Sequence, residues 1–329
     1  DREYRTAWMG SSRQELAYDG CFTRELTALL EGGVPKDRHP QSSLLTHLRV
    51  TDLAALLDNR CVGQKPVTGG FQTHDPAMYV AANRAAHEAI TRLGLSAQEG
   101  ELLLRLLERY QPYRLEELAE GIQRHRLSYL SGDAGTGKST LAAALREPPV
   151  SANVEPVDAV GFLGLINSAE ELADSLHRQL GTIPKFAHTA RTYRVKNQQR
   201  WESLSSMERL VLGPLSDYRH PLTIVLDGWD RLDSTRHQEV AGLIRRLATD
   251  EAWAHVRLAV TGRTDTHPPA AGHVARIGGL EPETARAYLT GRGVAESRHE
   301  SILEFAGGNW LVLELAAGYE ADRRANSGD

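Results

Sequence analysis

The sequence predicts an α/β protein built on a doubly wound parallel sheet, with a smaller α/β segment before it and a small helical subdomain after it. Three observations predict this fold class. Strand-like and helix-like segments alternate from about residue 127 onward. Residues 221–228, PLTIVLDG, form a continuous apolar run of the kind that fills a central parallel strand. A glycine-rich loop at 132–137 separates a predicted strand from a predicted helix.

The elements of this sheet follow in order along the chain. Predicted strands cover 127–130, 157–163, 221–228 and 256–263, and predicted helices cover 139–147, 169–180, 236–250, 282–292 and 299–321. Ser168 and Glu171 have the spacing of a capping box at the start of the second of these helices. Asp233 is interpreted as a solvated residue that caps the helix over 236–250.

The chain before this sheet divides into two parts. Predicted elements of the first part are a strand at 5–12, helices at 22–33 and 50–60, an extended piece at 64–72 and an apolar element at 75–83. A capping box, Ser96-x-x-Glu99, then opens a helix with a leucine stripe. The predicted domains are 1–86, a helical connector at 87–126, a nucleotide-binding core at 127–280 and a helical subdomain at 281–329.

Composition excludes several classes of function. The 329 residues carry a net charge of −5, with 41% hydrophobic and 25% charged residues, as in a globular protein. The charges are interspersed, so neither nucleic acid nor a membrane surface is an expected partner. No apolar run approaches the ~20 residues that span a bilayer. The chain begins at Asp1 rather than methionine, so we expect a fragment or a processed product.

The cysteines carry a further expectation. Cys21 and Cys61 lack the spacing of metal ligands, and two isolated cysteines are typical of a reducing compartment. The sequence therefore predicts a cytoplasmic protein whose cysteines are structural.

Residues 132–139 match the pattern G-x-x-x-x-G-K-[ST]. Glycines let the backbone curl so that its N–H groups surround phosphates, and the following helix N-terminus adds a favourable dipole. Lys138 would reach the β- and γ-phosphates, and the Ser139 hydroxyl would bind Mg²⁺. The predicted nucleotide-binding set is Gly132, Asp133, Ala134, Gly135, Thr136, Gly137, Lys138, Ser139 and Thr140, with ATP or ADP and Mg²⁺ as cofactors; the alternative is a glycine turn with an incidental lysine.

Carboxylates and an arginine follow the later strands. Asp227 ends the strand LTIVLD, where it would bind Mg²⁺ directly or through water. Asp230 is predicted to orient or deprotonate the attacking water, and its alternative role is in a solvated turn. Arg263 follows the strand VRLAVTG and is predicted to read the γ-phosphate, with a surface ion pair as the alternative.

The order GDAGTGKST, VLDGWDRLD, TGR and GGNWLVLEL resembles the STAND class of signalling NTPases, which includes NACHT and NB-ARC proteins. The resemblance covers about residues 110–321 and implies a switch, ADP-bound at rest and ATP-bound when assembled. Trp310 stands where the family usually has a proline on the adenine side of the nucleotide. Arg231 stands where NACHT proteins often have an acidic residue, which implies slow hydrolysis. No N-K-x-D guanine motif is present, so ATP is preferred to GTP.

Residues 4–86 resemble the C-terminal half of caspase-like peptidases of the bacterial metacaspase type, on the stretches RTAWMGSSRQELAYDGCFTRELTALLEGG, VTDLAALLDNR, QKPVTGGF and PAMYVAAN. The family's catalytic histidine and cysteine lie before this segment, so the dyad is absent from the chain. Cys21 matches a family position that is not the nucleophile, and His39, His47 and His74 have no partner at a recognisable spacing. Asp19 is a candidate for recognising a basic substrate residue; the alternative is a loop acid that caps the next helix.

The leading hypothesis is therefore an ATP-dependent switch that controls a fused caspase-like protease, in bacterial immunity or regulated cell death. Its predicted partners are copies of itself through the NTPase domain, a caspase-like large subunit if the protein is processed, and an unidentified trigger. One alternative is a non-proteolytic scaffold with a degenerate caspase-like module. The other is an AAA-type ATPase with an unrelated N-terminal domain.

Overall fold

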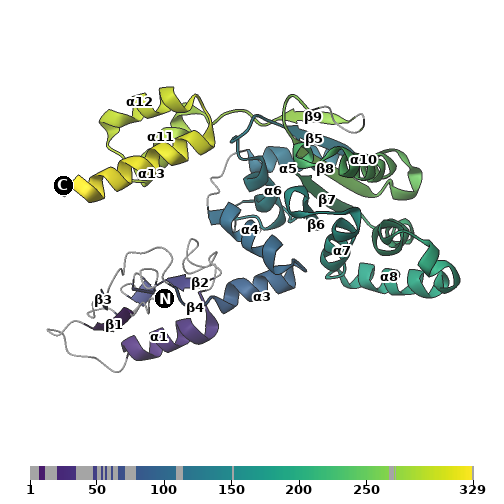
Figure 1. The fold of residues 1–329 in the computed structure, drawn as a ribbon, viewed down its shortest axis with the longest axis horizontal. Helices are drawn as coiled ribbons and strands as arrows, with labels where there is room; N and C mark the ends of the chain where they lie inside the picture. The colour runs from purple at the N-terminus through teal and green to yellow at the C-terminus, as the bar shows by residue number, and fades with distance from the viewer. Residues whose placement is uncertain are drawn as a thin grey trace. The chain divides into compact units, whose positions relative to one another are not determined.

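The computed structural model of the protein describes residues 7–11, 21–34, 47–49, 53–54, 56–57, 61, 66–70, 79–108, 114–149, 152–266, 270 and 272–327. The chain forms two compact units, Asp1–Arg109 and Tyr110–Asp329. Each unit is described separately, and Figure 1 gives the element labels.

The first unit contains two antiparallel strand pairs. Strand β1 (Ala7–Ser11) pairs with β3 (Pro66–Gly70), and β2 (His47–Arg49) pairs with β4 (Tyr79–Ala82). The described helices are α1 (Cys21–Gly32), α3 (Arg84–Arg92) and α4 (Ala97–Glu108). A small apolar core is made by Leu29, Val34, Leu48, Leu53, Leu56 and Leu57.

Helix α1 ends where the sequence places its paired glycines. Gly33 has φ +75, and its N–H donates to the Leu29 carbonyl. A Cβ at Gly33 would lie 2.5 Å from Asn83 Oδ1, the same oxygen that accepts a hydrogen bond from Val34 N–H. The glycine is therefore required both by the left-handed backbone and by the close approach of Asn83.

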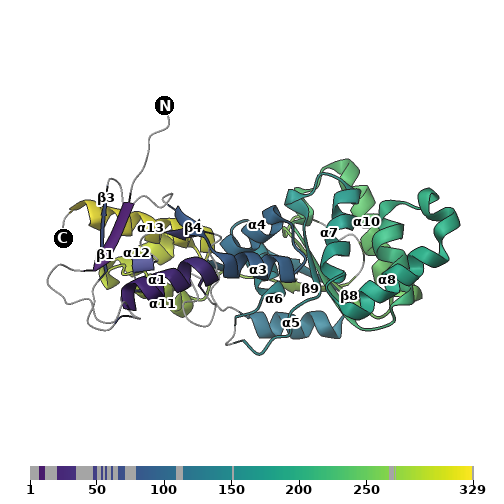
Figure 2. The same ribbon diagram turned by 90° about the horizontal axis from the view of Figure 1, so that it is seen from below.

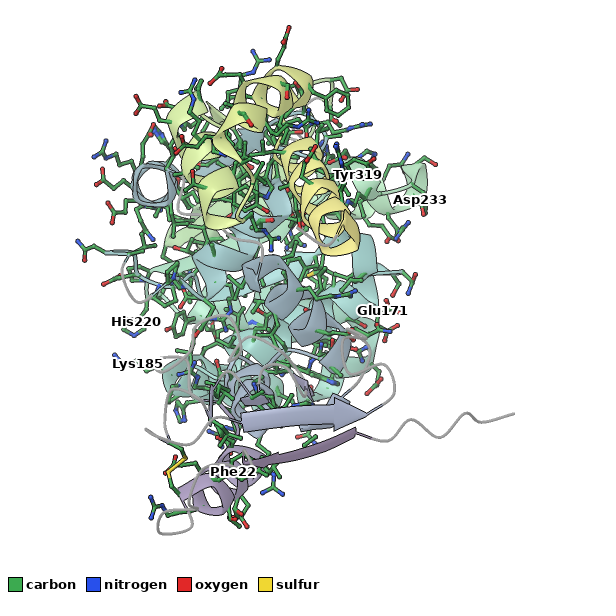
Figure 3. All side chains as sticks on the ribbon, turned by 90° about the vertical axis from the view of Figure 1, so that its left-hand side faces the viewer. Phe22, Glu171, Lys185, His220, Asp233 and Tyr319 are labelled. Carbon is green, nitrogen blue, oxygen red and sulfur yellow. A yellow bond between two sulfur atoms is a disulfide. The ribbon has the colours of Figure 1, made fainter. Side chains whose placement is uncertain are left out.

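The cysteines of the first unit correct an expectation. Cys21, the first residue of α1, forms a disulfide with Cys61 (Figure 3). The expectation that the two cysteines are isolated from each other is therefore wrong, because the fold brings together residues 40 positions apart. A structural role for both cysteines agrees with the pairing.

The second unit is built on a parallel five-stranded sheet with the order β6-β7-β8-β5-β9. The strands are β5 (Leu127–Ser131), β6 (Ala159–Phe162), β7 (Leu222–Asp227), β8 (Val256–Gly262) and β9 (His273–Arg276). The helices are α5 (Leu115–Arg124), α6 (Lys138–Arg146), α7 (Ala169–Leu180), α8 (Pro184–Lys196), α9 (Gly213–Asp217), α10 (Ser234–Thr249), α11 (Pro282–Gly291), α12 (Glu296–Ala306) and α13 (Trp310–Ser327). Short 3₁₀ turns cover Leu163–Leu165, Gln198–Ser203, Trp229–Arg231 and Glu251–Trp253, and one π-helical turn covers Glu208–Leu212. The α/β fold class with a P-loop-type parallel sheet is confirmed.

The chain order fixes which face of this sheet each helix covers. The crossover from β5 to β6 runs in the opposite direction to those from β6 to β7 and from β7 to β8. Because parallel crossovers are right-handed, α6 covers one face while α7 and α10 cover the other (Figure 2). The direction reverses between β5 and β8, and ligands of open α/β sheets bind at the carboxyl edge of such a point.

The helical subdomain departs from the sequence expectation in one respect. The single helix predicted over 299–321 is wrong, because Gly307 (φ +54) and Gly308 (φ +78) end α12 before α13 begins. Helices α11, α12 and α13 share a small core that includes Leu289, Ile302 and Leu313. None of the helices in the described part of the chain is long and apolar enough to cross a membrane.

Candidate nucleotide-binding site

The glycine loop connects β5 to α6 at the switch point of the sheet. Gly135 (φ +79) and Gly137 (φ +87) take left-handed backbone conformations that favour glycine. Gly137 directly precedes α6, so Lys138, Ser139 and Thr140 form its first turn. The loop therefore ends on a helix N-terminus, where backbone N–H groups and the helix dipole favour an anion.

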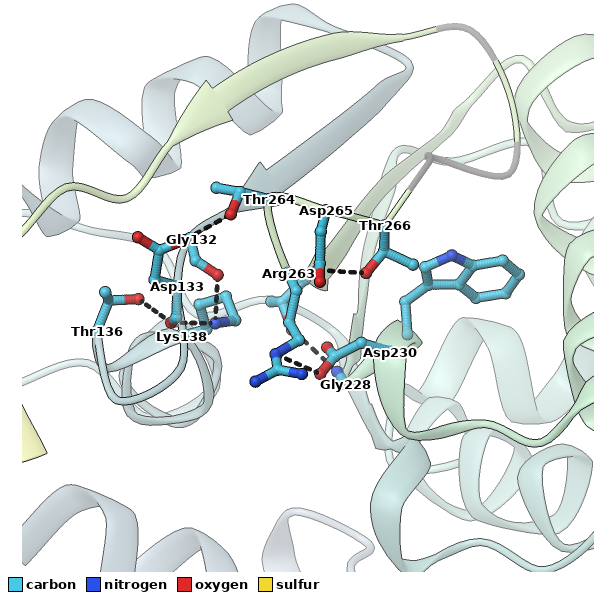
Figure 4. Close-up of polar contacts among 12 residues, drawn as sticks. Gly132, Asp133, Thr136, Lys138, Gly228, Asp230, Arg263, Thr264, Asp265 and Thr266 are labelled. Carbon is cyan, nitrogen blue, oxygen red and sulfur yellow. Dashed lines mark hydrogen bonds and ion pairs between the residues drawn. The ribbon is translucent and has the colours of Figure 1, made fainter.

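Within the loop, Lys138 lies against its own backbone. Its Nζ donates to the carbonyl oxygens of Gly132 and Asp133, each at 2.7 Å (Figure 4). Thr136 Oγ1 donates to Asp133 O at 2.9 Å, and the Thr264 hydroxyl bonds to the Asp133 carboxylate. Burial lowers the pKa of Lys138, and the carboxylates of Asp230 and Asp227 oppose that shift. These acceptors are neutral carbonyls, so the flexible ammonium can exchange them for a phosphate, which is a stronger, anionic acceptor.

Asp227 is the last residue of β7, and its side chain is buried. The Thr261 hydroxyl donates to its Oδ1 at 2.6 Å and accepts from Gly228 N–H at 2.9 Å. Burial raises the pKa of Asp227, while hydrogen bonds from Thr261 and Ser139 lower it. The Ser139 hydroxyl and the Asp227 carboxylate therefore meet at the foot of the loop. Hard oxygen ligands of this kind fit Mg²⁺, whose charge would offset the desolvation of the carboxylate.

Asp230 and Arg263 lie at the same edge of the sheet. Asp230 is in the 3₁₀ turn after β7, and Arg263 directly follows β8. Arg263 Nε is 3.9 Å from Asp230 Oδ2, with side chains 50% and 19% exposed respectively (Figure 4). A long and partly solvated ion pair contributes little to stability, so both groups can exchange partners at low cost.

The T-G-R sequence has a steric basis that the motif alone does not reveal. A Cβ at Gly262 would lie 2.0 Å from the Tyr129 hydroxyl. That hydroxyl is within hydrogen-bond distance, as donor, of two carbonyl oxygens: Arg263 O at 3.3 Å and Thr266 O at 3.2 Å. Tyr129 and Gly262 thus fix the backbone that carries Thr261 and Arg263. These roles involve residues more than 130 positions apart, for which the sequence carries no local signal.

The remaining predicted site residues either border this group or lie outside the described residues. Trp310 is the first residue of α13, with its ring centroid 4.5 Å from that of Tyr288 within the helical subdomain. The side chain of Arg231 approaches Gly164 and Gly228, and its charge lowers the pKa of Asp227. Asp19, His39 and His74 lie outside the described residues, and His47 is in β2.

Comparison with known proteins supports an ATPase domain in the second unit. Residues 105–258 match the family model described as "AAA ATPase domain", which supports an AAA-type ATPase domain in this chain. No curated protein matches. Among solved structures, the protein titled "Structure of C. elegans PCH-2" is similar at 11% identity, with 91% of this chain and 78% of that chain covered and a TM-score of 0.26. So low a TM-score carries no structural inference.

Proposed function

We propose that the protein is a Mg²⁺-dependent ATP-binding switch of the STAND type. The observation that carries the proposal is that the fold places Ser139, in the first turn of α6 after the glycine loop, at the same edge of the sheet as the buried Asp227 that ends β7, since a P-loop hydroxyl and a strand-end carboxylate form the usual magnesium site of P-loop NTPases. The order of the parallel strands and the match to an AAA ATPase domain are consistent with it.

The residues at this edge divide the work of ATP hydrolysis. Backbone N–H groups of the loop and the Lys138 ammonium bind the β- and γ-phosphates. Ser139 and Asp227 would hold Mg²⁺, and the bound ion would neutralise phosphate charge. Asp230 accepts a proton from the attacking water. The water oxygen bonds to the γ-phosphorus as the bond between the γ-phosphorus and the β–γ bridging oxygen breaks. Arg263 leaves its long ion pair with Asp230 and donates to the γ-phosphate.

The experiment is a binding titration of Mg·ADP. Lys138→Ala should abolish retention of nucleotide, because it removes the cation at the phosphates. Lys185→Ala is the matched control, since Lys185 is exposed on α8 within the same unit. Retention at wild-type stoichiometry in Lys138→Ala would show that the phosphate site lies elsewhere.

A second candidate is a constitutive AAA-type ATPase, which the family match favours. The two candidates differ in assembly. A STAND switch should be monomeric with ADP and assemble only with ATP and a trigger, whereas an AAA enzyme should form a ring irrespective of a trigger. Native mass spectrometry in each nucleotide distinguishes them.

We further propose that residues 1–86 are the small-subunit half of a caspase-like effector that the switch controls. The disulfide supports the view that the nucleophile is not Cys21, because a disulfide-bonded cysteine offers no thiolate. Cleavage after basic residues should then require the large-subunit half, and should respond to ATP. Assembly without any cleavage, with that half supplied, would favour the scaffold alternative.

A further inference from the structure

The helical subdomain donates hydrogen bonds to carbonyl groups of the glycine loop. Asn309, the residue before α13, donates from Nδ2 to the Ala134 carbonyl at 2.8 Å. Leu311 N–H, in the first turn of α13, donates to the Gly135 carbonyl at 3.1 Å. Two successive carbonyls of the loop are thus bound by one short segment more than 170 residues away in the sequence.

Each of these carbonyls shares its peptide unit with the N–H of the next loop residue, and the second of those N–H groups, on Thr136, donates to the Asp133 carbonyl at 3.4 Å. The Ala134 carbonyl shares a planar unit with Gly135 N–H, and the Gly135 carbonyl shares one with Thr136 N–H. In a trans peptide the C=O and N–H groups point in opposite directions. A hydrogen bond that fixes a carbonyl therefore fixes the direction of the N–H on the far side. It also polarises that N–H as a donor.

The Asn309 side chain is itself held in one orientation. Its Oδ1 accepts a hydrogen bond from Val312 N–H at 3.3 Å, which caps α13. A Cβ at Gly135 would lie 2.4 Å from the same oxygen, so the amide packs directly against the glycine. Leu280 N–H, just before α11, donates to Gly308 O at 2.9 Å and anchors the turn that carries Asn309. The amide thus connects the loop to the start of a helix.

We infer that Asn309 is a positioning residue of the phosphate site, which orients the Gly135 N–H through the Ala134 carbonyl and couples phosphate binding to the attachment of the helical subdomain. The inference rests on the proposed nucleotide site and adds a residue that acts through the loop. Because Asn309 bonds to the Ala134 carbonyl of the loop, its effect should depend on the phosphates and not on the adenine.

Asn309→Ser is the discriminating variant. Serine is a good helix cap, so it can still accept from Val312 N–H, but it is too short to donate to Ala134 O. We expect Mg·ADP and Mg·pyrophosphate to bind about fivefold more weakly by calorimetry, the equivalent of about 1 kcal/mol for one hydrogen bond. Arg298→Ala is the control, since it removes an ion pair with Glu320 inside the subdomain and leaves Asn309 in place. It should leave both affinities unchanged.

Hydrogen exchange separates positioning from a general loss of structure. In the wild type, Mg·ADP should slow exchange of the first-turn amides of α13. In Asn309→Ser, saturating Mg·ADP should no longer do so, while ligand-free exchange of the helix stays at the wild-type rate. Affinities and exchange equal to the wild type would overturn the inference, as would faster ligand-free exchange of the whole of α13. Failure of the wild type to bind either probe would instead overturn the proposed function.

Discussion

At Asp227, the charge that the proposed function needs is one that lowers the stability of the ligand-free protein. The folded chain buries its carboxylate, and that burial raises its pKa. The folded state therefore holds the proton more tightly than the unfolded state. Stability without ligand should fall as pH rises from the unfolded pKa of the carboxyl through the raised folded one. The buried charge is useful only when a cation is bound beside it.

Asp227→Asn tests this trade-off. The amide oxygen can still accept from Thr261, and its NH₂ can donate to the Ser139 hydroxyl, without a buried charge. We expect the ligand-free protein to become more stable by on the order of 1 kcal/mol at neutral pH, while Mg²⁺-dependent hydrolysis is lost. Denaturant unfolding and a phosphate-release assay measure the two effects. A destabilised variant that keeps its activity would contradict both parts.

Asp230 should separate hydrolysis from binding. Asp230→Ala removes the proposed proton acceptor and the ion-pair partner of Arg263, but leaves the loop and Asp227 intact. Turnover should slow by about 10²–10⁴-fold, the usual range for a lost general base, while the Kd for Mg·ADP changes little. Equal loss of turnover and binding would assign Asp230 a structural role.

At the scale of elements, burial decided which segments the sequence could predict. Strand β7 is buried throughout and was predicted from its apolar run. Strand β9 lies at the sheet edge with Val274 exposed, so it lacks the apolar pattern of a strand and was missed. The capping residues were predicted well because their partners are three residues away. Ser96 and Glu99 form both bonds of a capping box, and Asp233 accepts from Arg236 N–H.

The residues of the site differ in the same way, because some are fixed by a local motif and others by contacts far along the chain. The loop residues and Asp227 are visible in the sequence because motif chemistry fixes their spacing. Asn309 and Tyr129 act on backbone groups far away in the chain, so only the fold reveals them. Sequence patterns report local geometry, whereas support for a site comes from tertiary contacts.

The junction of β5 and β8 gives an element-scale prediction. Gly262→Ala should reduce hydrolysis by displacing Thr261 and Arg263, since its Cβ would overlap the Tyr129 hydroxyl. Adding Tyr129→Phe removes the oxygen at 2.0 Å but leaves ring carbon Cζ at 2.8 Å, so rescue should be partial. A double-mutant cycle on turnover measures the coupling. Strictly additive effects would show that the two residues do not act through this contact.

At the scale of the whole molecule, the disulfide and the nucleotide site lie in different compact units. Cys21 and Cys61 are the chain's two cysteines, and both belong to the unit Asp1–Arg109. The disulfide closes a loop of 40 residues, for which the chain-entropy estimate is roughly 4 kcal/mol. That stabilisation is comparable to the net stability of a small domain.

Reduction should therefore act on one unit and nucleotide on the other. With dithiothreitol, hydrogen exchange should speed up in peptides from α1 and remain unchanged in peptides from β5 and α6. Mg·ADP should have the reverse pattern, slowing exchange at the loop and leaving α1 unchanged. Cys21→Ser/Cys61→Ser is the matched control, since it should mimic reduction and be insensitive to dithiothreitol. Altered hydrogen exchange at the glycine loop on reduction would contradict this separation and would show that the disulfide is coupled to the nucleotide site.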